Sequence, residues 1–417
     1  MGGGKKKGKG KRKKKPPPEH LLSHKYIKEW VFGDSLDAAA AADDFEPTLP
    51  GRSCLTDRVV FEFHCHSKCS DGFLSPYAVV EKAHRNGVKV LSLTDHDTMA
   101  GIPEAMEAAR KFGMLIVPGV EISSICFPGA ENEEPVHILA YYGSCGPSAH
   151  EELNELLTHI RDGRFIRAKK MLLKLNNLKI PLKWEQVFKV AGEGVAPGRL
   201  HVAKAMVQAG YVESLKQAFS KYLYDGGPAY AMGNEPSAAA AVQLICKTGG
   251  VAALAHPWAL KNPAAVIRSL KSAGLHAMEV YRADGKVVGF GEFADSHDLI
   301  KLGGSDFHGR GGNDESELGS VDLPLISICK FLKLARPIWC DTARSILQRF
   351  SEEPSSANLE KITMFGKPVN LRKCASIKRG KDIIDLCLSS WLTIEERQAV
   401  QFEEIRRKLS DVGVSLT

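Results

Sequence analysis

The sequence lacks several features that mark particular classes of protein. No apolar run reaches the roughly 20 residues that span a membrane, and no apolar segment follows the basic first residues, so neither a transmembrane helix nor a secretory signal is predicted. The ten cysteines form no repeated CxxC pattern, and they would stay reduced in the cytosol or nucleus. We therefore expect an intracellular soluble protein, nuclear or cytoplasmic, without membrane contact.

The excess of positive charge lies in one segment, and the rest of the chain lacks it. The formal net charge is +7, but residues 5–15 hold nine Lys or Arg and no acidic residue, so the rest of the chain is close to neutral. Residues 1–18 are predicted to be a disordered basic tail because they have almost nothing to bury. Such a tail could be a nuclear localisation signal, an arm that contacts nucleic acid, or a solvated segment without a specific role.

The remaining chain has the pattern of an α/β protein. It is long enough for one large or two modest domains, with 417 residues of which 44% are hydrophobic. Short β-rich runs alternate with helix-length segments, which predicts βα units and a parallel sheet. The predicted strands are Val59–Phe63, Val88–Leu93, Leu115–Val120, Val136–Tyr142, Val251–Ala255, Ala277–Tyr281 and Leu299–Leu302. Seven strands favour a closed or nearly closed barrel.

The domain boundaries are predicted where this alternation of strands and helices changes. After the basic tail and an irregular lead-in at 19–57, the barrel is expected over residues 58–147 and 247–325. Residues 148–246 read as an inserted helical subdomain that carries several basic residues. Residues 326–417 read as a partly helical C-terminal extension. Within the barrel, Ser75-Pro76 predicts a helix N-terminus, and Asn86-Gly87 its end.

Histidines and carboxylates fall at the ends of successive predicted strands. His64 and His66 end the first strand, and their spacing of two puts both imidazoles on one face. Side chains at the carboxyl ends of barrel strands converge on one mouth, so the later residues should join this pair. The nine candidate metal ligands are His64, His66, Asp71, His96, Glu121, His137, His256, Asp306 and His308. Each motif alone is weak, and the ordered series is what predicts a site.

The residue types indicate the chemistry of this site. Mixed imidazoles and carboxylates suit Zn, Mn or Fe better than Mg or Ca, which prefer oxygen ligands. One tetrahedral zinc needs only about four ligands, so nine candidates indicate two or three metal ions, an arrangement suited to phosphoester hydrolysis. Cys65 should point away from the two flanking histidines, and we interpret both Cys65 and Cys69 as bystanders.

Six sequence strings resemble, in the same order, the polymerase and histidinol phosphatase (PHP) superfamily. They are FEFHCHSKCSDG, SLTDHDT, VPGVEIS, HILAYY, AHP and GGSDFHG, and the match covers about residues 58–310. The resemblance implies a distorted seven-stranded (β/α)7 barrel with two or three divalent metal ions, Mn before Zn, Fe or Mg. It assigns one metal to His64, His66, Glu121 and Asp306, a second to Glu121, His137 and His256, and a third to Asp71, His96 and His308.

A segment of the predicted insertion resembles one branch of this superfamily in particular. Residues 197–201, PGRLH, resemble the GRPH element of the branch that dephosphorylates nucleoside 3′,5′-bisphosphates and trims short RNA from the 5′ end, with leucine in place of proline. Arg199 would bind a phosphate through its fork, and His201 would add a hydrogen-bond donor or a proton. The alternative is an ordinary helix start with an exposed Arg and His. Asp95 is a third catalytic candidate, unless it only orients His96.

These motifs predict a metal-dependent phosphoesterase that acts on nucleoside bisphosphates or short RNA. One alternative is a histidinol-phosphatase-like or general phosphomonoesterase activity at the same site. Another is a non-catalytic barrel that binds nucleic acid, which would be expected to have lost ligands. All nine ligand positions are occupied by suitable residues, which favours an enzyme. No particular protein partner is indicated.

Overall fold

The structure, a computed structural model, describes residues 17–32, 59–131, 133–285, 289–312, 315–363 and 398–409. The basic run at 5–15 lies outside these ranges, so the predictions made for the tail stay predictions. Within the described ranges, no helix is both long enough and apolar enough to cross a membrane.

Within the described ranges, eight short strands form two sheets, so the predicted seven-stranded barrel is not confirmed. Below, the word barrel denotes these two sheets with the helices that cover them. The strands are β1 (Val60–Glu62), β2 (Val88–Leu91), β3 (Leu115–Ile116), β4 (Gly119–Cys126), β5 (Glu134–Tyr141), β6 (Val251–Leu254), β7 (Ala277–Tyr281) and β8 (Ile300–Gly303). One sheet has the order β1-β2-β3 and the other β4-β5-β6-β7-β8. Isolated bridges between Cys65 and Phe307 and between His96 and Glu121 connect the strand ends of the two sheets.

Two features of the sequence explain why the arrangement differs from a parallel ring. The predicted strand Leu115–Val120 divides around Pro118, which has no N–H to donate to a ladder. β3 pairs with β2, whereas β4 pairs with β5. β5 is antiparallel to both β4 and β6, contrary to the all-parallel prediction. The connection between β4 and β5 is too short for the crossover that parallel neighbours require.

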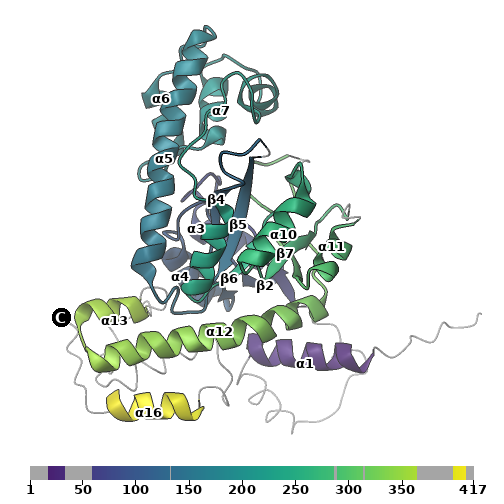
Figure 1. The fold of residues 1–417 in the computed structure, drawn as a ribbon, viewed down its shortest axis with the longest axis vertical. Helices are drawn as coiled ribbons and strands as arrows, with labels where there is room; N and C mark the ends of the chain where they lie inside the picture. The colour runs from purple at the N-terminus through teal and green to yellow at the C-terminus, as the bar shows by residue number, and fades with distance from the viewer. Residues whose placement is uncertain are drawn as a thin grey trace, which may run out of the picture.

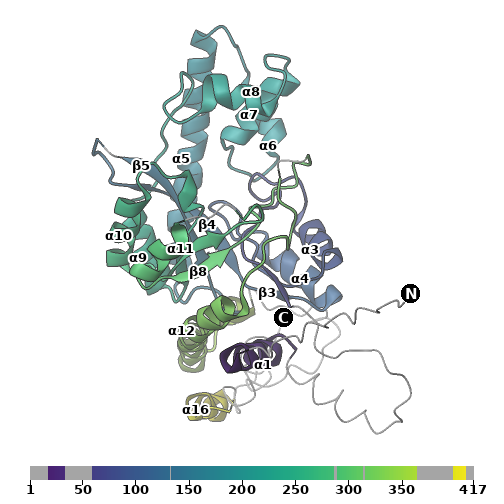
Figure 2. The same cartoon turned by 90° about the vertical axis from the view of Figure 1, so that its right-hand side faces the viewer.

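Helices cover the outer faces of both sheets (Figures 1 and 2). They are α3 (Pro76–Arg85), α4 (Ile102–Phe112), α9 (Ala238–Lys247), the short 3₁₀ turn η2 (Pro257–Ala259), α10 (Pro263–Ala273) and α11 (Phe290–Ser296). The predicted start of α3 is confirmed, because the Ser75 hydroxyl accepts a hydrogen bond from the Ala78 N–H at 3.2 Å. The helix ends before Gly87, whose φ of 82° suits glycine.

The predicted helical insertion has a hydrophobic core of its own. It comprises α5 (His150–Asn177), α6 (Trp184–Ala191), α7 (Arg199–Gln208), α8 (Leu215–Ala218) and the π-helix η1 (Phe219–Leu223). The amino-terminal part of α5 packs into the barrel core through Leu153 and Leu157, and its later part packs into the insertion core through Met171 and Leu175. The last helix before β6, α9, packs into the barrel core, so the predicted boundary at 246 lies too late.

Two segments outside the predicted barrel, the lead-in and the C-terminal extension, add a helical layer on one side (Figure 1). The lead-in was predicted to be irregular, but its first part forms α1 (Pro18–Phe32), which buries Ile27 and Trp30. The C-terminal extension contributes α12 (Leu325–Glu352), α13 (Ser356–Thr363) and α16 (Val400–Leu409). α1 packs against α12, where the Arg336 guanidinium lies 5.1 Å from the ring centre of Tyr26. A buried partner helix stabilises α1, and local sequence does not reveal that partner.

Aromatic side chains join α12 to the barrel core. The Phe331 ring lies 5.2 Å from Phe63, 5.6 Å from Tyr141 and 5.9 Å from Trp339, measured between ring centres, in edge-to-face contacts. The Trp339 indole N–H donates to the Tyr141 carbonyl at 3.2 Å. Since Phe63 directly precedes His64, this cluster supports the strand end that carries the first two predicted ligands.

Replacing Phe331 with alanine should destabilise the whole protein. The side chain is fully buried, and truncation of a buried phenylalanine typically costs about 3–5 kcal/mol. Denaturant unfolding followed by circular dichroism would measure the change. The matched control is Phe188→Ala, because 42% of Phe188 is exposed. Equal unfolding free energies for the two variants would show that α12 is dispensable for the barrel.

Candidate metal centre

All nine predicted ligands lie in one cluster at the ends of the strands. The loops after β1, β2, β6 and β8 supply most of them, and β4 and β5 supply Glu121 and His137 from within the strands. Among the described residues, three groups have ligand atoms close enough to share a metal ion. The groups are His66 with Asp71, His96 and His308; His64 with His66 and Glu121; and His96 with Glu121 and His137. His66 and His96 each belong to two groups, so the division differs from the one that the family resemblance implies.

Glu121 lies at the centre of this cluster and is buried. Its two carboxylate oxygens are surrounded by imidazole nitrogens: Oε2 by His64 at 3.3 Å, His66 at 3.2 Å and His96 at 3.1 Å, and Oε1 by His137 and His256, both at 3.0 Å. Burial alone would raise the pKa of Glu121, but the histidines hold that pKa well below its usual range. Glu121 is therefore an ionised carboxylate that can bridge metal ions.

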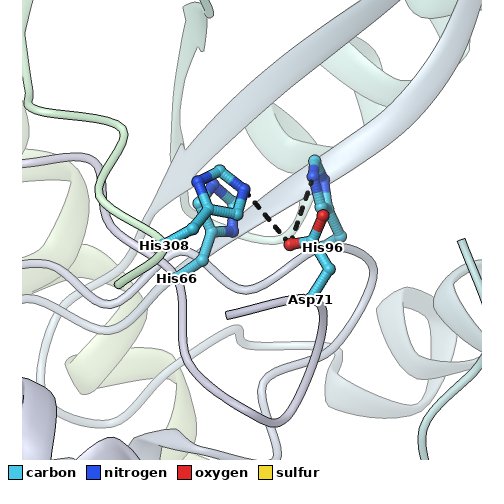
Figure 3. A group of neighbouring side chains, drawn as sticks. All are labelled: His66, Asp71, His96 and His308. Atoms are coloured by element: carbon cyan, nitrogen blue, oxygen red, sulfur yellow. Dashed lines mark ion pairs between the residues drawn. The ribbon is translucent and has the colours of Figure 1, made fainter. Parts of the chain in front are cut away.

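Asp71 forms the outer part of the cluster. One of its carboxylate oxygens lies 3.2 Å from Nε2 of His308 and 3.9 Å from Nε2 of His96. Figure 3 shows both imidazoles turned toward this carboxylate, with His66 behind His308. Although burial raises the pKa of Asp71, His308 and His96 lower it well below the usual range. Asp306 connects this part to the centre, because its Oδ1 lies 3.1 Å from Nε2 of His66.

Unpaired buried atoms show that these residues fit metal ions. Nε2 of His64, Nδ1 of His96, Oδ1 of Asp71 and Oε2 of Glu121 are buried without a hydrogen-bond partner among the described residues. Buried polar atoms are normally paired. Ligand atoms bound to one metal at roughly 2.0–2.2 Å lie about 3.0–3.5 Å apart, and the spacings around Glu121 fall in this range. The cluster therefore has the donor types and the spacing of a divalent metal centre.

The backbone is strained at two of these ligands. His256 has a φ of 28° and Asp306 a φ of 52°, a region that residues with side chains rarely adopt. Such strain persists where the surrounding structure holds it, and it gathers at functional sites. A side chain on Gly304 would collide with the backbone nitrogen of His64, so only glycine lets the chain before Asp306 approach β1 so closely.

Two buried glutamates that the sequence analysis did not select hold these ligands in place. Glu279, on β7, lies 3.0 Å from Nδ1 of His64 through Oε1, and its Oε2 accepts from the His256 N–H at 2.7 Å. Glu62, on β1, accepts from the backbone N–H groups of His64, Ser305 and Gly319. By accepting from Nδ1, Glu279 leaves Nε2 of His64 free to face Glu121. The sequence feature that could have identified both glutamates is a charged residue within a strand that is predicted to be buried.

Asp95, predicted to be catalytic or only to orient His96, hydrogen-bonds to the loop that follows His66. Its carboxylate accepts hydrogen bonds from the Ser67 N–H at 2.7 Å, the Ser67 hydroxyl at 2.6 Å and the Ser70 hydroxyl at 2.7 Å. These bonds order the loop between His66 and Asp71, and Asp95 belongs to none of the three metal-competent groups. The structure favours a positioning role over a catalytic one.

Arg199 and His201, both predicted to bind phosphate, have different surroundings in the structure. Arg199 lines a cavity of about 180 Å³ that also contacts Asp71, His96 and His137. His201 instead caps α7, because its Nδ1 accepts from the Gly198 N–H at 3.0 Å. Burial lowers the pKa of His201 to about 4, so the imidazole is neutral at pH 7 and is a poor proton source. With Nδ1 as an acceptor, the proton of the neutral ring is on Nε2, which can still donate, so His201 as the predicted hydrogen-bond donor stays a prediction.

Further arginines bring positive charge to the same cavity. Arg164, on α5, donates to Asp97 at 2.7 Å and to the Ser123 hydroxyl at 2.7 Å, which ties the insertion to the barrel. Arg167 lies 2.5 Å from Glu235. Arg310, in the loop after His308, also lines the cavity. In the sequence, Arg164 and Arg167 are simply two of the several basic residues of the insertion, because their position depends on how α5 crosses the barrel mouth.

Comparisons with known proteins agree with this fold and site. The sequence model of the PHP domain matches residues 62–178. A 3′,5′-nucleoside bisphosphate phosphatase of Chromobacterium violaceum is 32% identical over 296 residues, which cover 69% of this chain and 98% of the relative. A 5′-3′ exoribonuclease of Haemophilus influenzae is 34% identical over 258 residues, or 60% of this chain and 89% of the relative.

Solved structures give the same assignment. A Bifidobacterium adolescentis protein described as a metal-dependent phosphoesterase matches with a TM-score of 0.57 and 28% identity, over 66% of this chain and 95% of that one. A C. violaceum protein described as an amidohydrolase matches with a TM-score of 0.58 and 30% identity, over 69% of this chain and 97% of that one. The fold and the cluster are those of the metal-dependent phosphoesterases. Within that class, the chain belongs to the PHP family.

Replacing Glu279 with glutamine should weaken metal binding without unfolding the protein. The amide can still contact His64 but loses the negative charge, and loss of such a supporting group typically costs about 10–100-fold in metal affinity. Titration of the metal-free protein with Mn²⁺ by calorimetry would measure the change. The exposed Glu185→Gln variant is the matched control. Unchanged Mn²⁺ affinity in Glu279→Gln would remove Glu279 from the metal centre.

Proposed function

We propose that this protein is a metal-dependent phosphoesterase that acts on nucleoside 3′,5′-bisphosphates, on the 5′ ends of short RNA, or on both. The observation that carries the proposal is the opening of the Glu121 cluster into a cavity lined by four arginines, Arg164, Arg167, Arg199 and Arg310. A metal centre provides the hydrolytic chemistry, and the arginines suit a substrate with more than one phosphate. The named activities of the two bacterial relatives support this choice.

We assign the nine clustered residues as the metal ligands, with Glu121 shared between ions. Divalent ions held there would activate water and supply positive charge to the phosphoryl group. Mn²⁺ is our first choice, with Zn²⁺, Fe²⁺ and Mg²⁺ as alternatives, because the ligand set mixes imidazole and carboxylate. The chain itself orients the ligands through Glu279, Glu62 and Asp95.

Arg199 is positioned to bind a second phosphate of the substrate. Its guanidinium donates to Asp225 at 2.5 Å and to the Leu223 carbonyl at 3.3 Å, which holds it at the cavity wall. The ion pair is partly exposed, with side-chain exposures of 31% for Arg199 and 49% for Asp225, and exposed pairs contribute only about 0–1 kcal/mol. A phosphate dianion can therefore compete with Asp225 for this guanidinium.

The alternative readings have weaker support. A general phosphomonoesterase would need the metal cluster but not the arginine-lined cavity. A non-catalytic nucleic-acid-binding barrel would not need nine converging ligands. The basic tail remains a candidate for RNA contact or nuclear targeting. The named relatives are bacterial, so they lend no support to a nuclear location.

Metal restoration should produce phosphatase activity. Protein stripped of metal and reloaded with Mn²⁺ should release inorganic phosphate from adenosine 3′,5′-bisphosphate and mononucleotides from short 5′-phosphorylated RNA. Glu121→Gln should be inactive, because it removes the shared negative charge. Absence of activity on both substrates with Mn²⁺, Zn²⁺, Fe²⁺ and Mg²⁺ would refute the proposal. Hydrolysis of p-nitrophenyl phosphate alone would favour the general phosphomonoesterase.

Variants of the Arg199–Asp225 pair should change the KM for the bisphosphate in opposite directions. Arg199→Ala removes a charge-assisted contact worth about 1.5–3 kcal/mol, which corresponds to a rise in KM of about 10–100-fold. Asp225→Asn frees the guanidinium and should lower KM by up to about fivefold. Adenosine 5′-monophosphate should respond much less. Arg85→Ala, which removes a mostly exposed arginine on α3, is the control. Equal effects on both nucleotides would exclude Arg199 from recognition of the second phosphate.

A further inference from the structure

The cavity that joins the barrel to the insertion is lined by apolar as well as charged side chains. The charged side chains and imidazoles are Asp71, His96, His137, Glu235 and the four arginines. The apolar side chains are Ile125, Pro135, Leu200, Phe219, Tyr230 and Met232. Neither phosphate binding nor metal binding uses these apolar side chains, so another portion of the ligand is the candidate to contact them.

Several of these apolar side chains keep accessible surface. Met232 is 41% exposed and belongs to none of the hydrophobic clusters of the described residues. Phe219 and Tyr230 are partly exposed as well. Two aromatic rings and a flexible thioether that face one cavity suit a flat, polarisable ring system.

The local backbone places these rings beside Arg199. Phe219 begins the π-helix η1, whose wide turn is closed by the Tyr224 N–H donating to the Phe219 carbonyl at 3.0 Å. π-Helical turns are rare and occur frequently at functional sites. The Arg199 guanidinium, held by the Leu223 carbonyl at the end of the same turn, lies 5.7 Å from the centre of the Tyr230 ring. A phosphate on Arg199 would therefore bring its nucleoside next to Tyr230.

We propose that Phe219, Tyr230 and Met232 form a nucleobase site, in which the base stacks on the aromatic rings while the phosphates contact Arg199 and the metal centre. The inference rests on the proposed function and adds the part of the substrate that is not phosphate. The charged and the apolar side chains line one cavity, so a single ligand can contact both. Stacking accepts every base, so the site should show little base preference.

The test compares substrates with and without a base. Full-length protein loaded with Mn²⁺ is assayed on adenosine, guanosine, cytidine and uridine 3′,5′-bisphosphates and on ribose 3,5-bisphosphate, which has no base. Stacking on aromatic side chains is worth about 5- to 100-fold per base. We expect KM for the abasic compound to exceed that of the nucleotides by such a factor, with the four nucleotides within a few fold of each other.

Single-residue variants test which side chains cause the difference in KM between nucleotides and the abasic compound. Tyr230→Ala should raise KM for the nucleotides but not for ribose 3,5-bisphosphate, and Tyr230→Phe, which keeps the ring, should restore the wild-type values. Met232→Ala should act in the same direction as Tyr230→Ala. The exposed Phe188→Ala is the aromatic control in the same insertion, and unfolding midpoints identify any variant that misfolds. Equal loss on base-containing and abasic substrates in Tyr230→Ala would overturn the inference.

The outcomes separate this inference from the proposed function. If wild-type protein hydrolyses nucleotides and the abasic compound with the same KM, the nucleobase site is refuted while the phosphoesterase stands. If neither is hydrolysed with any divalent metal, the proposed function itself fails. A strong preference for one base would also overturn stacking as the mode of recognition, because it would require hydrogen bonds to the base edge.

Discussion

The buried carboxylate of Glu121 is the interaction on which the rest of the site depends. Five imidazoles approach its two oxygens, and they come from the ends or interiors of four strands, β1, β2, β5 and β6. A charge in this position is costly unless it is neutralised. The arrangement therefore requires cations at the barrel mouth, and it constrains where β4 can run. The division of the predicted third strand around Pro118 lets β4 leave β3 and place Glu121 at this centre.

The layers beneath the site hold its members in register. Glu62 and Glu279 are buried below the ligands and accept hydrogen bonds from groups on separate loops. Under them, the aromatic cluster around Phe331 fixes the strand that ends in His64. The metal-facing surface is polar and strained, whereas the opposite side is closely packed and apolar. Strain at His256 and Asp306 is sustained because this support cannot easily relax.

The gathering of the nine candidate ligands was predictable from sequence, because most of them follow strand ends in order, although Glu121 and His137 lie within strands. The outward orientation of Cys65, whose thiol lies 3.4 Å from the Ser92 carbonyl, follows from strand periodicity. Other features depend on contacts between distant segments. The antiparallel β5, the packing of α1 on α12, and Glu279 under His64 leave only weak local signals. For His201, a motif indicated a chemical role, and the structure adds that its imidazole caps α7, which the motif did not indicate.

The long helix α5 connects two hydrophobic cores. Its early turns pack into the barrel and its later turns pack into the insertion, and the change occurs near Gly163 and Arg164, where the Asn234 backbone passes too close for a side chain on Gly163. A continuous helix transmits the loss of packing at one end to the other, since its hydrogen bonds form cooperatively. The insertion and the barrel therefore share one continuous helix, and the residues of α5 that line the cavity, Arg164 and Arg167, lie between the two cores.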